Sequence, residues 1–144
     1  MDTKNIVCQD CNSINAVTIK NTLNSAICTN CEADLDDPFP LEVSDTSCTL
    51  HILKNDIPIL VDFYSPACGP CMAMYDDYED AALAFGLQVR FLKINADEHQ
   101  EVAKKYGVSG LPTIIAFHQG EEVNRISSQL SQTQLNLWAQ SLIS

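Results

Sequence analysis

The stretch Ile57-Pro-Ile-Leu-Val-Asp-Phe-Tyr64-Ser-Pro-Ala-Cys68-Gly-Pro-Cys71 joins a run of β-forming residues to a pair of cysteines. The run Ile57–Tyr64 is apolar enough for a central strand, and Pro58 fits only at its start. From Cys68 to Phe85 apolar residues recur at steps of three and four, which predicts a helix that begins at the cysteine pair. A buried strand that leads directly into a helix predicts part of a βαβ unit.

Helices and strands alternate on both sides of this stretch. We expect a helix over Ser44–Asn55, a strand over Gln88–Asn95, a helix over Asp97–Tyr106 with Asp97 as its cap, a hairpin of Thr113–Phe117 and Val123–Ile126, and a last helix capped by Ser131. Strands separated by helices pair in parallel, whereas the hairpin adds antiparallel strands. The predicted fold class is therefore α/β, with part of the sheet parallel and part antiparallel.

The pair Cys68-Gly69-Pro70-Cys71 has the properties of a redox site. A thiol at a helix N-terminus meets the positive end of the helix dipole and unpaired amide groups, both of which stabilise its thiolate. Pro70 fits the first turn, where a missing N–H is harmless, and Gly69 lets the chain turn tightly. We therefore expect Cys68 to be the nucleophile and Cys71 to be the resolving thiol. The alternative is one half of a further metal site.

Two more cysteine pairs, Cys8/Cys11 and Cys28/Cys31, precede this region, with sixteen residues between them. This is the spacing of a four-cysteine zinc ribbon, in which two tight turns each supply two thiolates to one tetrahedral ion. Four thiolates leave no open position, so the predicted zinc is structural. The alternatives are two local disulfides or free thiols, and iron can use the same ligands. The seventh cysteine, Cys48, is expected to be a small buried or partly buried thiol.

Composition divides the chain of 144 residues near residue 40. Residues 1–36 contain short strands and too little apolar surface to fold without a metal, whereas residues 43–144 carry the alternating pattern. Residues 37–42, between them, contain two prolines in an acidic context and are interpreted as a linker. We therefore expect an N-terminal zinc ribbon, a linker and an α/β domain.

Charge and hydropathy exclude several kinds of partner. The formal net charge is −11 and no basic patch is visible, so neither nucleic acid nor a membrane surface is an expected partner. No run approaches the roughly 18 apolar residues of a membrane span, and the N-terminus shows no apolar signal segment. We therefore expect a cytoplasmic protein that meets other proteins.

Four motifs, Val61-Asp-Phe-Tyr64, Cys68-Gly-Pro-Cys71, Gly110-Leu-Pro-Thr113 and Phe117-His-Gln-Gly120, resemble the successive motifs of the thioredoxin family. The four-cysteine prefix is similar to that of the zinc-containing thioredoxin 2 of bacteria. The resemblance implies the thioredoxin fold, a central mixed sheet flanked by helices, and dithiol–disulfide exchange with disulfide-containing protein substrates. It also implies a monomer that binds no organic cofactor and receives electrons from NADPH through thioredoxin reductase.

The resemblance further implies roles for single residues. Asp62 matches a buried carboxylate beneath the disulfide that assists proton transfer at the resolving cysteine, a role that a raised pKa would suit. The alternative for Asp62 is a strand-end cap. Lys93 matches a lysine that faces this carboxylate, with a solvated strand residue as the alternative. Pro112 matches a cis-proline beside the disulfide, and the free backbone of Leu111 could then pair with a substrate strand.

Three positions depart from the family pattern: Ala67 stands for a tryptophan, Met72 for a basic residue and Asp76 for a helix proline. Ala67 and Met72 flank the cysteine pair, so they are expected to change the substrate surface and the redox potential. The three histidines share no ligand spacing and are expected at the surface: His51, His99 and His118.

Two functions of different class follow from these patterns. The first is a protein-disulfide reductase that carries a zinc ribbon. The second is a zinc-dependent protein-binding module, or a redox sensor, that uses the thioredoxin domain as a scaffold. The intact Cys68/Cys71 pair favours the enzyme.

Overall fold

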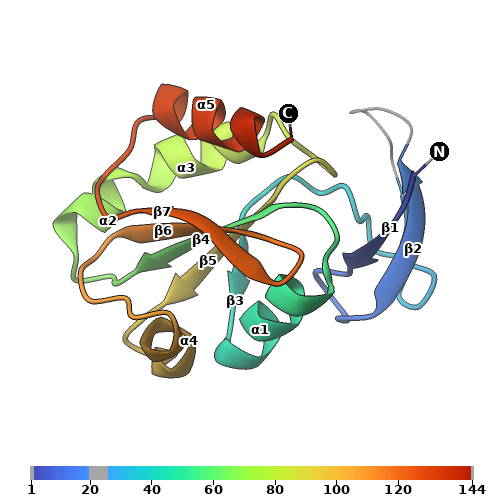
Figure 1. The fold of residues 1–144 in the computed structure, drawn as a ribbon, viewed down its shortest axis with the longest axis horizontal. Coiled ribbons are helices and arrows are strands. Elements are labelled where there is room, and N and C mark those ends of the chain that lie inside the picture. The colour runs from blue at the N-terminus through green and yellow to red at the C-terminus, as the bar shows by residue number, and fades with distance from the viewer. Residues whose placement is uncertain (1, 20–25, 144) are drawn as a thin grey trace.

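The computed structural model describes residues 2–19 and 26–143, which form a five-stranded sheet with its helices and a separate two-stranded hairpin (Figure 1). In chain order the elements are β1 (Asp2–Val7), β2 (Ile14–Ile19), β3 (Leu41–Val43), α1 (Asp45–Lys54), β4 (Ile59–Tyr64), α2 (Gly69–Ala73), α3 (Tyr75–Ala82), β5 (Arg90–Asn95), α4 (Gln100–Lys105), β6 (Thr113–His118), β7 (Glu121–Ile126) and α5 (Gln132–Ile143). Among the described residues, no helix has the length and apolar character needed to cross a membrane.

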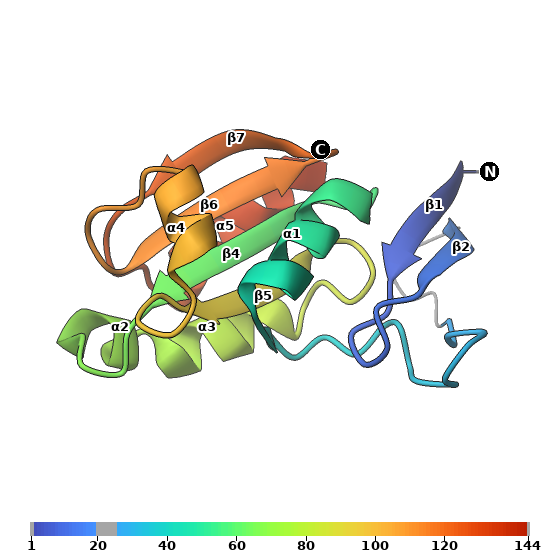
Figure 2. The same ribbon diagram turned by 90° about the horizontal axis from the view of Figure 1, so that it is seen from below.

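The five-stranded sheet has the order β3-β5-β4-β6-β7 and is mixed, as expected. β4 pairs in parallel with β5 and antiparallel with β6, and β6 and β7 form the expected hairpin. α1 and α4 cover one face of the sheet, and α3 and α5 cover the other (Figures 1 and 2). The molecule therefore has three layers, with an apolar core on each side of the sheet.

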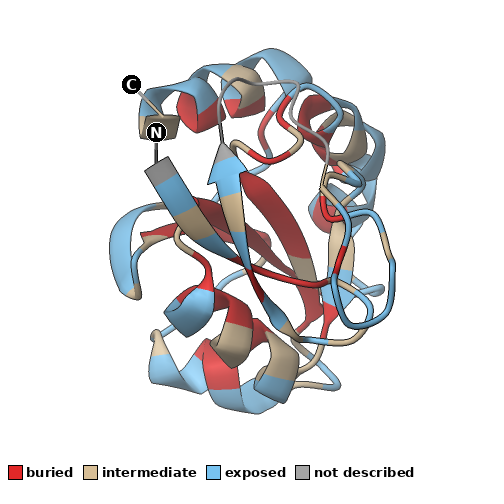
Figure 3. Ribbon diagram, turned by 90° about the vertical axis from the view of Figure 1, so that its right-hand side faces the viewer, coloured by how far each residue is buried: buried red, intermediate tan, exposed pale blue. Residues whose placement is uncertain are grey.

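β4 lies at the centre of the sheet because both of its faces are apolar. Ile59, Leu60, Val61 and Phe63 are each at most 1% exposed, and Figure 3 shows the central strands buried along most of their length. Leu60 belongs to the core under α3 and α5, whereas Val61 and Phe63 belong to the core under α1 and α4. Side chains alternate along a strand, so Asp62 shares the face of Leu60.

The helix expected over Cys68–Phe85 is divided at Met74. The Met74 amide is shared between the carbonyls of Pro70 and Cys71, so the last turn of α2 is tighter than an α-helical turn. The Met74 sulfur also accepts a hydrogen bond from the Leu130 amide at 3.4 Å, which fixes this break against the segment before α5. The expectation of one continuous helix was wrong because periodicity does not reveal such a tightened turn.

α4 begins at Gln100, so the prediction of Asp97 as its cap was wrong. The Asn95 side chain accepts hydrogen bonds from the amides of Asp97 at 3.0 Å and Glu98 at 3.4 Å, which holds these residues in a turn. The cap of α5 is confirmed, because Ser131 Oγ accepts from the Gln134 amide while the Gln134 side chain accepts from the Ser131 amide.

The end of the expected linker is part of the sheet. Leu41–Val43 forms β3, which pairs in parallel with Leu92–Ile94 of β5 and makes one edge of the sheet. Leu35, just before the expected linker, is fully buried. The connection is therefore held against the molecule at both of its ends.

The N-terminal hairpin of β1 and β2 lies at the end of the sheet opposite to α2 (Figure 1). The Asn5 amide donates to Asp56 Oδ2 at 2.7 Å, and the Asp56 amide donates to the Asn5 carbonyl at 2.9 Å. The Val7 amide donates to Asn55 Oδ1 at 2.8 Å. An apolar cluster spans the same junction and contains Ile6, Cys8, Cys28 and Leu35 together with Ile57 and Leu87.

The expectation that His51 lies at the surface was wrong. His51 is fully buried in α1, and its Nδ1 lies 2.7 Å from the side-chain nitrogen of Asn55. Burial, followed by the charge of Arg90, lowers the pKa of His51 to about 3, so the ring is neutral. His51 thus supports the asparagine that receives the Val7 amide. Cys48 in the same helix is fully buried, as predicted.

Candidate functional site

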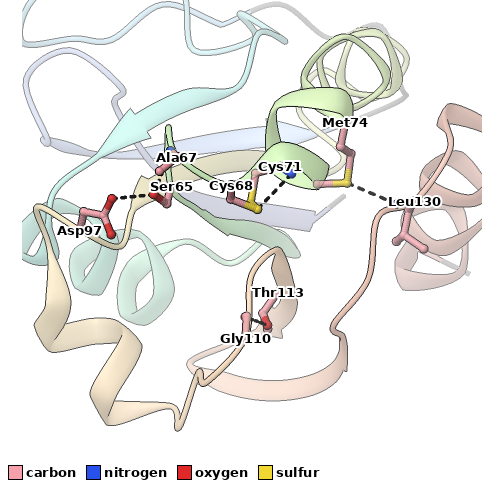
Figure 4. Close-up of a disulfide and its surroundings, with 9 residues drawn as sticks. All are labelled: Ser65, Ala67, Cys68, Cys71, Met74, Asp97, Gly110, Thr113 and Leu130. Atoms are coloured by element: carbon pink, nitrogen blue, oxygen red, sulfur yellow. Dashed lines mark hydrogen bonds between the residues drawn. A yellow bond between two sulfur atoms is a disulfide. The ribbon is translucent and has the colours of Figure 1, made fainter.

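Cys68 and Cys71 form a disulfide at the start of α2 (Figure 4). Their Cα atoms are 5.3 Å apart, and the Cys71 amide donates to Cys68 Sγ at 3.2 Å. Cys68 is the N-cap of α2 and is half-buried, whereas Cys71 is 2% exposed. Gly69 and Pro70, between them, are exposed, and Pro70 lies in the first turn of α2, as expected. One sulfur of the pair is therefore more accessible than the other.

The turn before the disulfide is held by Ser65, which no motif in the sequence marks as part of the site. Ser65 is 6% exposed and its hydroxyl donates to Asp97 Oδ2 at 2.5 Å. The same hydroxyl oxygen accepts from the Ala67 amide at 3.2 Å, and the Ser65 carbonyl accepts from the Cys68 amide at 3.0 Å. These contacts fix the direction in which the chain enters α2. No spacing pattern connects Ser65 with Asp97, which are 32 residues apart.

The loop before β6 faces the disulfide in Figure 4. Its Leu111–Pro112 peptide bond is cis, in agreement with the resemblance. Pro112 is buried and Leu111 is half-buried, while the Thr113 hydroxyl donates to the Gly110 carbonyl at 2.6 Å. A cavity of about 260 Å³ adjoins this loop and α4, and its lining includes Leu111 and Lys104.

Two side chains that depart from the family pattern flank the disulfide. Ala67 is exposed directly before Cys68, and Met72 is 40% exposed directly after Cys71. Neither side chain carries a charge. The surface around the accessible sulfur is therefore small and apolar on both sides of the cysteine pair.

Asp62 is a buried carboxyl on β4, on the face that α3 covers. It is 3% exposed, and its Oδ1 has no hydrogen-bond partner among the described residues. Burial raises the pKa of Asp62 to about 7; Lys93 opposes this rise and Glu42 adds to it. Asp62 therefore changes its protonation state near neutral pH.

Lys93 lies next to Asp62 in the register of β4 and β5, but it forms no ion pair with it in the described part of the chain. Its Nζ instead lies over the ring of Tyr75, 3.9 Å from the centroid, and 4.9 Å from the centroid of Tyr64. Tyr64 in turn donates its hydroxyl proton to Glu42 at 2.5 Å. Lys93 is thus held between two rings, one of which, Tyr75, no sequence motif marks as part of the site.

The sulfur atoms of Cys8, Cys11, Cys28 and Cys31 all lie within 4.8 Å of one another, although sixteen residues separate the two pairs. Cys8 and Cys31 are 3.5 Å apart, and Cys11 and Cys28 are 3.6 Å apart. Zn–S bonds of about 2.3 Å in a tetrahedron place sulfur atoms about 3.8 Å apart. The four cysteines therefore fit one tetrahedral metal ion.

Two equivalent turns present these cysteines. The Asn12 amide donates to the Cys8 carbonyl, and the Glu32 amide donates to the Cys28 carbonyl. Asn12 and Glu32 occupy the same position of each turn, and both have positive φ angles, 64° and 67°. The repeated geometry matches the repeated C-x-x-C spacing.

Amide groups donate to the sulfur atoms. The Asn30 side chain donates to Cys11 Sγ at 3.4 Å and, with Ser13, lowers the pKa of Cys11 to about 6. The buried Asn15 side chain donates to Cys28 Sγ at 3.4 Å. Such donors stabilise thiolates, the form that binds metals. The cysteine spacing does not predict roles for Asn15 and Asn30, although Asn30 lies inside the second cysteine pair.

The thioredoxin family model matches residues 40–141. The thioredoxin of Rhodospirillum rubrum is 37% identical over 102 residues, which cover 71% of this chain and 98% of that protein. Thioredoxin 1 of Nostoc sp. is 32% identical over 95 residues, covering 66% of this chain and 89% of the relative. A solved structure of a mutant thioredoxin from Halobacterium salinarum is 31% identical, with a TM-score of 0.68, and the match covers 74% of this chain and 93% of that one.

These matches, together with a bonded C-x-x-C pair at a helix N-terminus, define a thiol–disulfide oxidoreductase. The chain belongs to the thioredoxin family. The expected thioredoxin fold is confirmed, and the four-cysteine group fits the expected ribbon before it. The family match begins at residue 40, so this group lies outside it.

Proposed function

We propose that this protein is a protein-disulfide reductase of the zinc-containing thioredoxin 2 type. The observation that carries the proposal is the Cys68–Cys71 disulfide, in which one sulfur is half-buried at a helix N-terminus and the other is buried behind it. Relatives named thioredoxin at 32–37% identity support the same chemistry.

In the reduced protein, the Cys68 thiolate attacks one sulfur of a substrate disulfide. A Cys68–substrate disulfide forms and the other substrate sulfur leaves as a thiolate. Cys71, once deprotonated, then attacks Cys68 Sγ, so the second substrate sulfur leaves and the Cys68–Cys71 disulfide closes. The dithiol has lost two electrons and two protons, and the substrate has gained them. The greater exposure of Cys68 supports this order of attack.

Asp62 accepts the proton of Cys71 during the second step. A base works best when its pKa lies near the working pH, and burial raises that of Asp62 to about 7. Lys93 acts on this carboxyl through its charge, from its position between Tyr64 and Tyr75.

The substrate surface consists of the loop before β6 and the residues that flank the disulfide. Leu111 offers its backbone to an extended substrate segment, and Pro112 holds this loop beside the disulfide. Ala67 and Met72 add small and apolar contacts, which favour apolar substrate segments over charged ones.

The oxidised protein is returned to the dithiol by thioredoxin reductase with electrons from NADPH, and disulfide-containing proteins are its substrates. It works as a monomer in the cytoplasm. Residues 1–36 form a ribbon domain that Cys8, Cys11, Cys28 and Cys31 close around one structural zinc ion. The zinc supplies folding energy to a segment that has little core of its own.

Insulin reduction tests the activity, first with dithiothreitol and then with NADPH and thioredoxin reductase. Cys68→Ser should abolish turnover, whereas Cys71→Ser should accumulate a mixed disulfide at Cys68 that mass spectrometry detects. Cys48→Ser is the matched control. Cys48 is a buried free cysteine outside the C-x-x-C pairs, so its replacement should leave turnover unchanged. Normal turnover by Cys71→Ser would refute the order of attack, and an inactive wild type would favour a binding module or sensor.

Metal analysis of the reduced protein tests the ribbon. We expect one zinc ion per chain, and none in a Cys28→Ser/Cys31→Ser variant. An unchanged zinc content in that variant would refute the assignment of the four ligands.

A further inference from the structure

Arg90 is a buried cation at the junction between the hairpin and the sheet. It is the first residue of β5 and is 2% exposed. The ion pair found among the described residues joins Arg125 and Glu122. Arg90 therefore has no carboxylate within ion-pair distance in that part of the chain. A buried guanidinium without a negative partner is strongly destabilising, so the charge that offsets it has to lie nearby.

Among residues 2–19 and 26–143, the guanidinium of Arg90 donates only to carbonyls of the N-terminal region. Its Nη2 donates to the Leu35 carbonyl at 3.1 Å and to the Val7 carbonyl at 3.5 Å, and its Nη1 donates to the Asp37 carbonyl at 3.5 Å. Val7 directly precedes the ligand Cys8, and Leu35 packs in the same apolar cluster as Cys8 and Cys28. One side chain of the sheet thus holds both chain segments that carry the metal ligands.

The four-cysteine group adds to the negative charge that Asp37 and Asp36 place near Arg90. Four thiolates around a divalent ion carry a net charge of −2. Cys8 and Cys28 are fully buried, so water screens this charge poorly. Burial lowers the pKa of Arg90 to about 10, whereas the charges of Asp37, Cys8 and Asp36 raise it and keep the side chain protonated at neutral pH.

We infer that Arg90 is the internal counter-ion of the four-cysteine metal site and the clamp that holds the metal-loaded ribbon on the thioredoxin domain. The inference rests on the proposed function, in which these four cysteines bind zinc. Outer partners of metal ligands commonly change metal affinity by about 10- to 100-fold. Arg90 acts one step further out, through the carbonyls of Val7 and Leu35 in the segments that carry the ligands.

The coupling is reciprocal. A ribbon that has lost its metal no longer offsets the charge of Arg90, so the contacts to Val7 and Leu35 weaken. Loss of Arg90 likewise weakens the hold on the ligand-bearing segments. The disulfide lies at the opposite end of the sheet (Figure 1), so exchange chemistry should be unaffected by either change.

The test compares Arg90→Met and Arg90→Lys with Arg125→Met and Arg125→Lys, in full-length, zinc-loaded, reduced protein. Zinc release to 4-(2-pyridylazo)resorcinol is followed by absorbance, and cleavage at the acidic residues 32–37 by Glu-C protease. Arg90→Met should release zinc at least about 10-fold faster than wild type and be cleaved faster in this segment. The Arg125 variants should match wild type, since Arg125 pairs with Glu122 on β7.

Zinc release from Arg90→Met at the wild-type rate would overturn the inference. If Arg90→Met does not fold, Arg90→Lys decides, because an ammonium group keeps the charge but cannot reproduce the fork to three carbonyls. Arg90→Lys should release zinc several-fold faster than Arg125→Lys, and equal rates of zinc release from these two variants would overturn the inference. A wild-type protein without zinc would refute the metal site itself, whereas altered release confined to the Arg125 variants would refute only the role of Arg90.

Discussion

Replacement of Asp62 by asparagine should stabilise the folded protein at alkaline pH and have little effect at acid pH. Asp62 is 3% exposed, and burial raises its pKa from 3.8 to about 7. Asparagine has nearly the same shape and carries no charge. The substitution therefore removes the ionisation of a buried group while preserving the packing between β4 and α3.

The sign follows from proton linkage. The folded protein holds the Asp62 proton between pH 3.8 and about 7, where the unfolded chain has released it. The stability that this group contributes is fully present below pH 3.8 and is lost as the pH rises to about 7. One pKa unit corresponds to about 1.4 kcal/mol, so the loss over the whole interval is about 4 kcal/mol.

Urea unfolding at pH 5 and pH 8 measures this difference. The oxidised proteins are used, because the bonded Cys68 and Cys71 do not titrate. Trp138, on the buried face of α5, serves as the fluorescent probe. Between pH 5 and pH 8, the free energy of unfolding of Asp62→Asn should rise by about 3 kcal/mol relative to that of wild type. About two pH units separate pH 5 from the folded pKa of about 7. The exposed Asp76→Asn is the matched control and should gain nothing.

A stability difference between Asp62→Asn and wild type that stays constant from pH 5 to pH 8 would refute this reasoning. It would show that the Asp62 carboxyl titrates as it does in the unfolded chain. A difference that grows toward acid pH would reverse the sign and contradict the raised pKa.

Three further outcomes are expected. A chain that starts at Leu41 should fold and reduce disulfides, but its free energy of unfolding in urea should be lower by roughly 3 kcal/mol or more, because Ile57 and Leu87 lose their cover and Arg90 loses its three acceptors. Unfolding at the wild-type urea midpoint would show that the ribbon folds independently of the sheet. His51→Gln should lose less stability than wild type on acidification from pH 6.5 to pH 4.5, by about 2 kcal/mol, since over this range the unfolded chain binds a proton that buried His51, with its pKa of about 3, does not bind; identical acid profiles would contradict burial of a neutral ring. Met72→Arg should lower the Cys68 pKa and raise the redox potential by on the order of 10 mV, measured by thiolate absorbance and glutathione equilibration; a lower potential would contradict the electrostatic argument.

The sequence by itself determined the fold class and the chemistry of the cysteines. The run Ile57–Tyr64 is apolar on both faces, and a strand of that kind can be stable only at the centre of a covered sheet. The Cys68-Gly-Pro-Cys71 spacing places a thiol at a helix start, and the two earlier pairs have the spacing of a metal site. These features depend on local spacing, which the chain carries without reference to its tertiary structure.

The tertiary structure alone decided contacts between residues that are distant in sequence. Arg90 is separated by 83 residues from Val7, to which it donates, and Ser65 by 32 residues from Asp97. His51 has no pattern that marks it as buried, because its environment depends on Asn55 and on the hairpin docked beyond it. The division of the expected helix at Met74 depends on Leu130 in the same way. A local pattern fixes which residues are apolar or reactive, but the partners that satisfy a buried polar group are chosen only when the whole chain has folded.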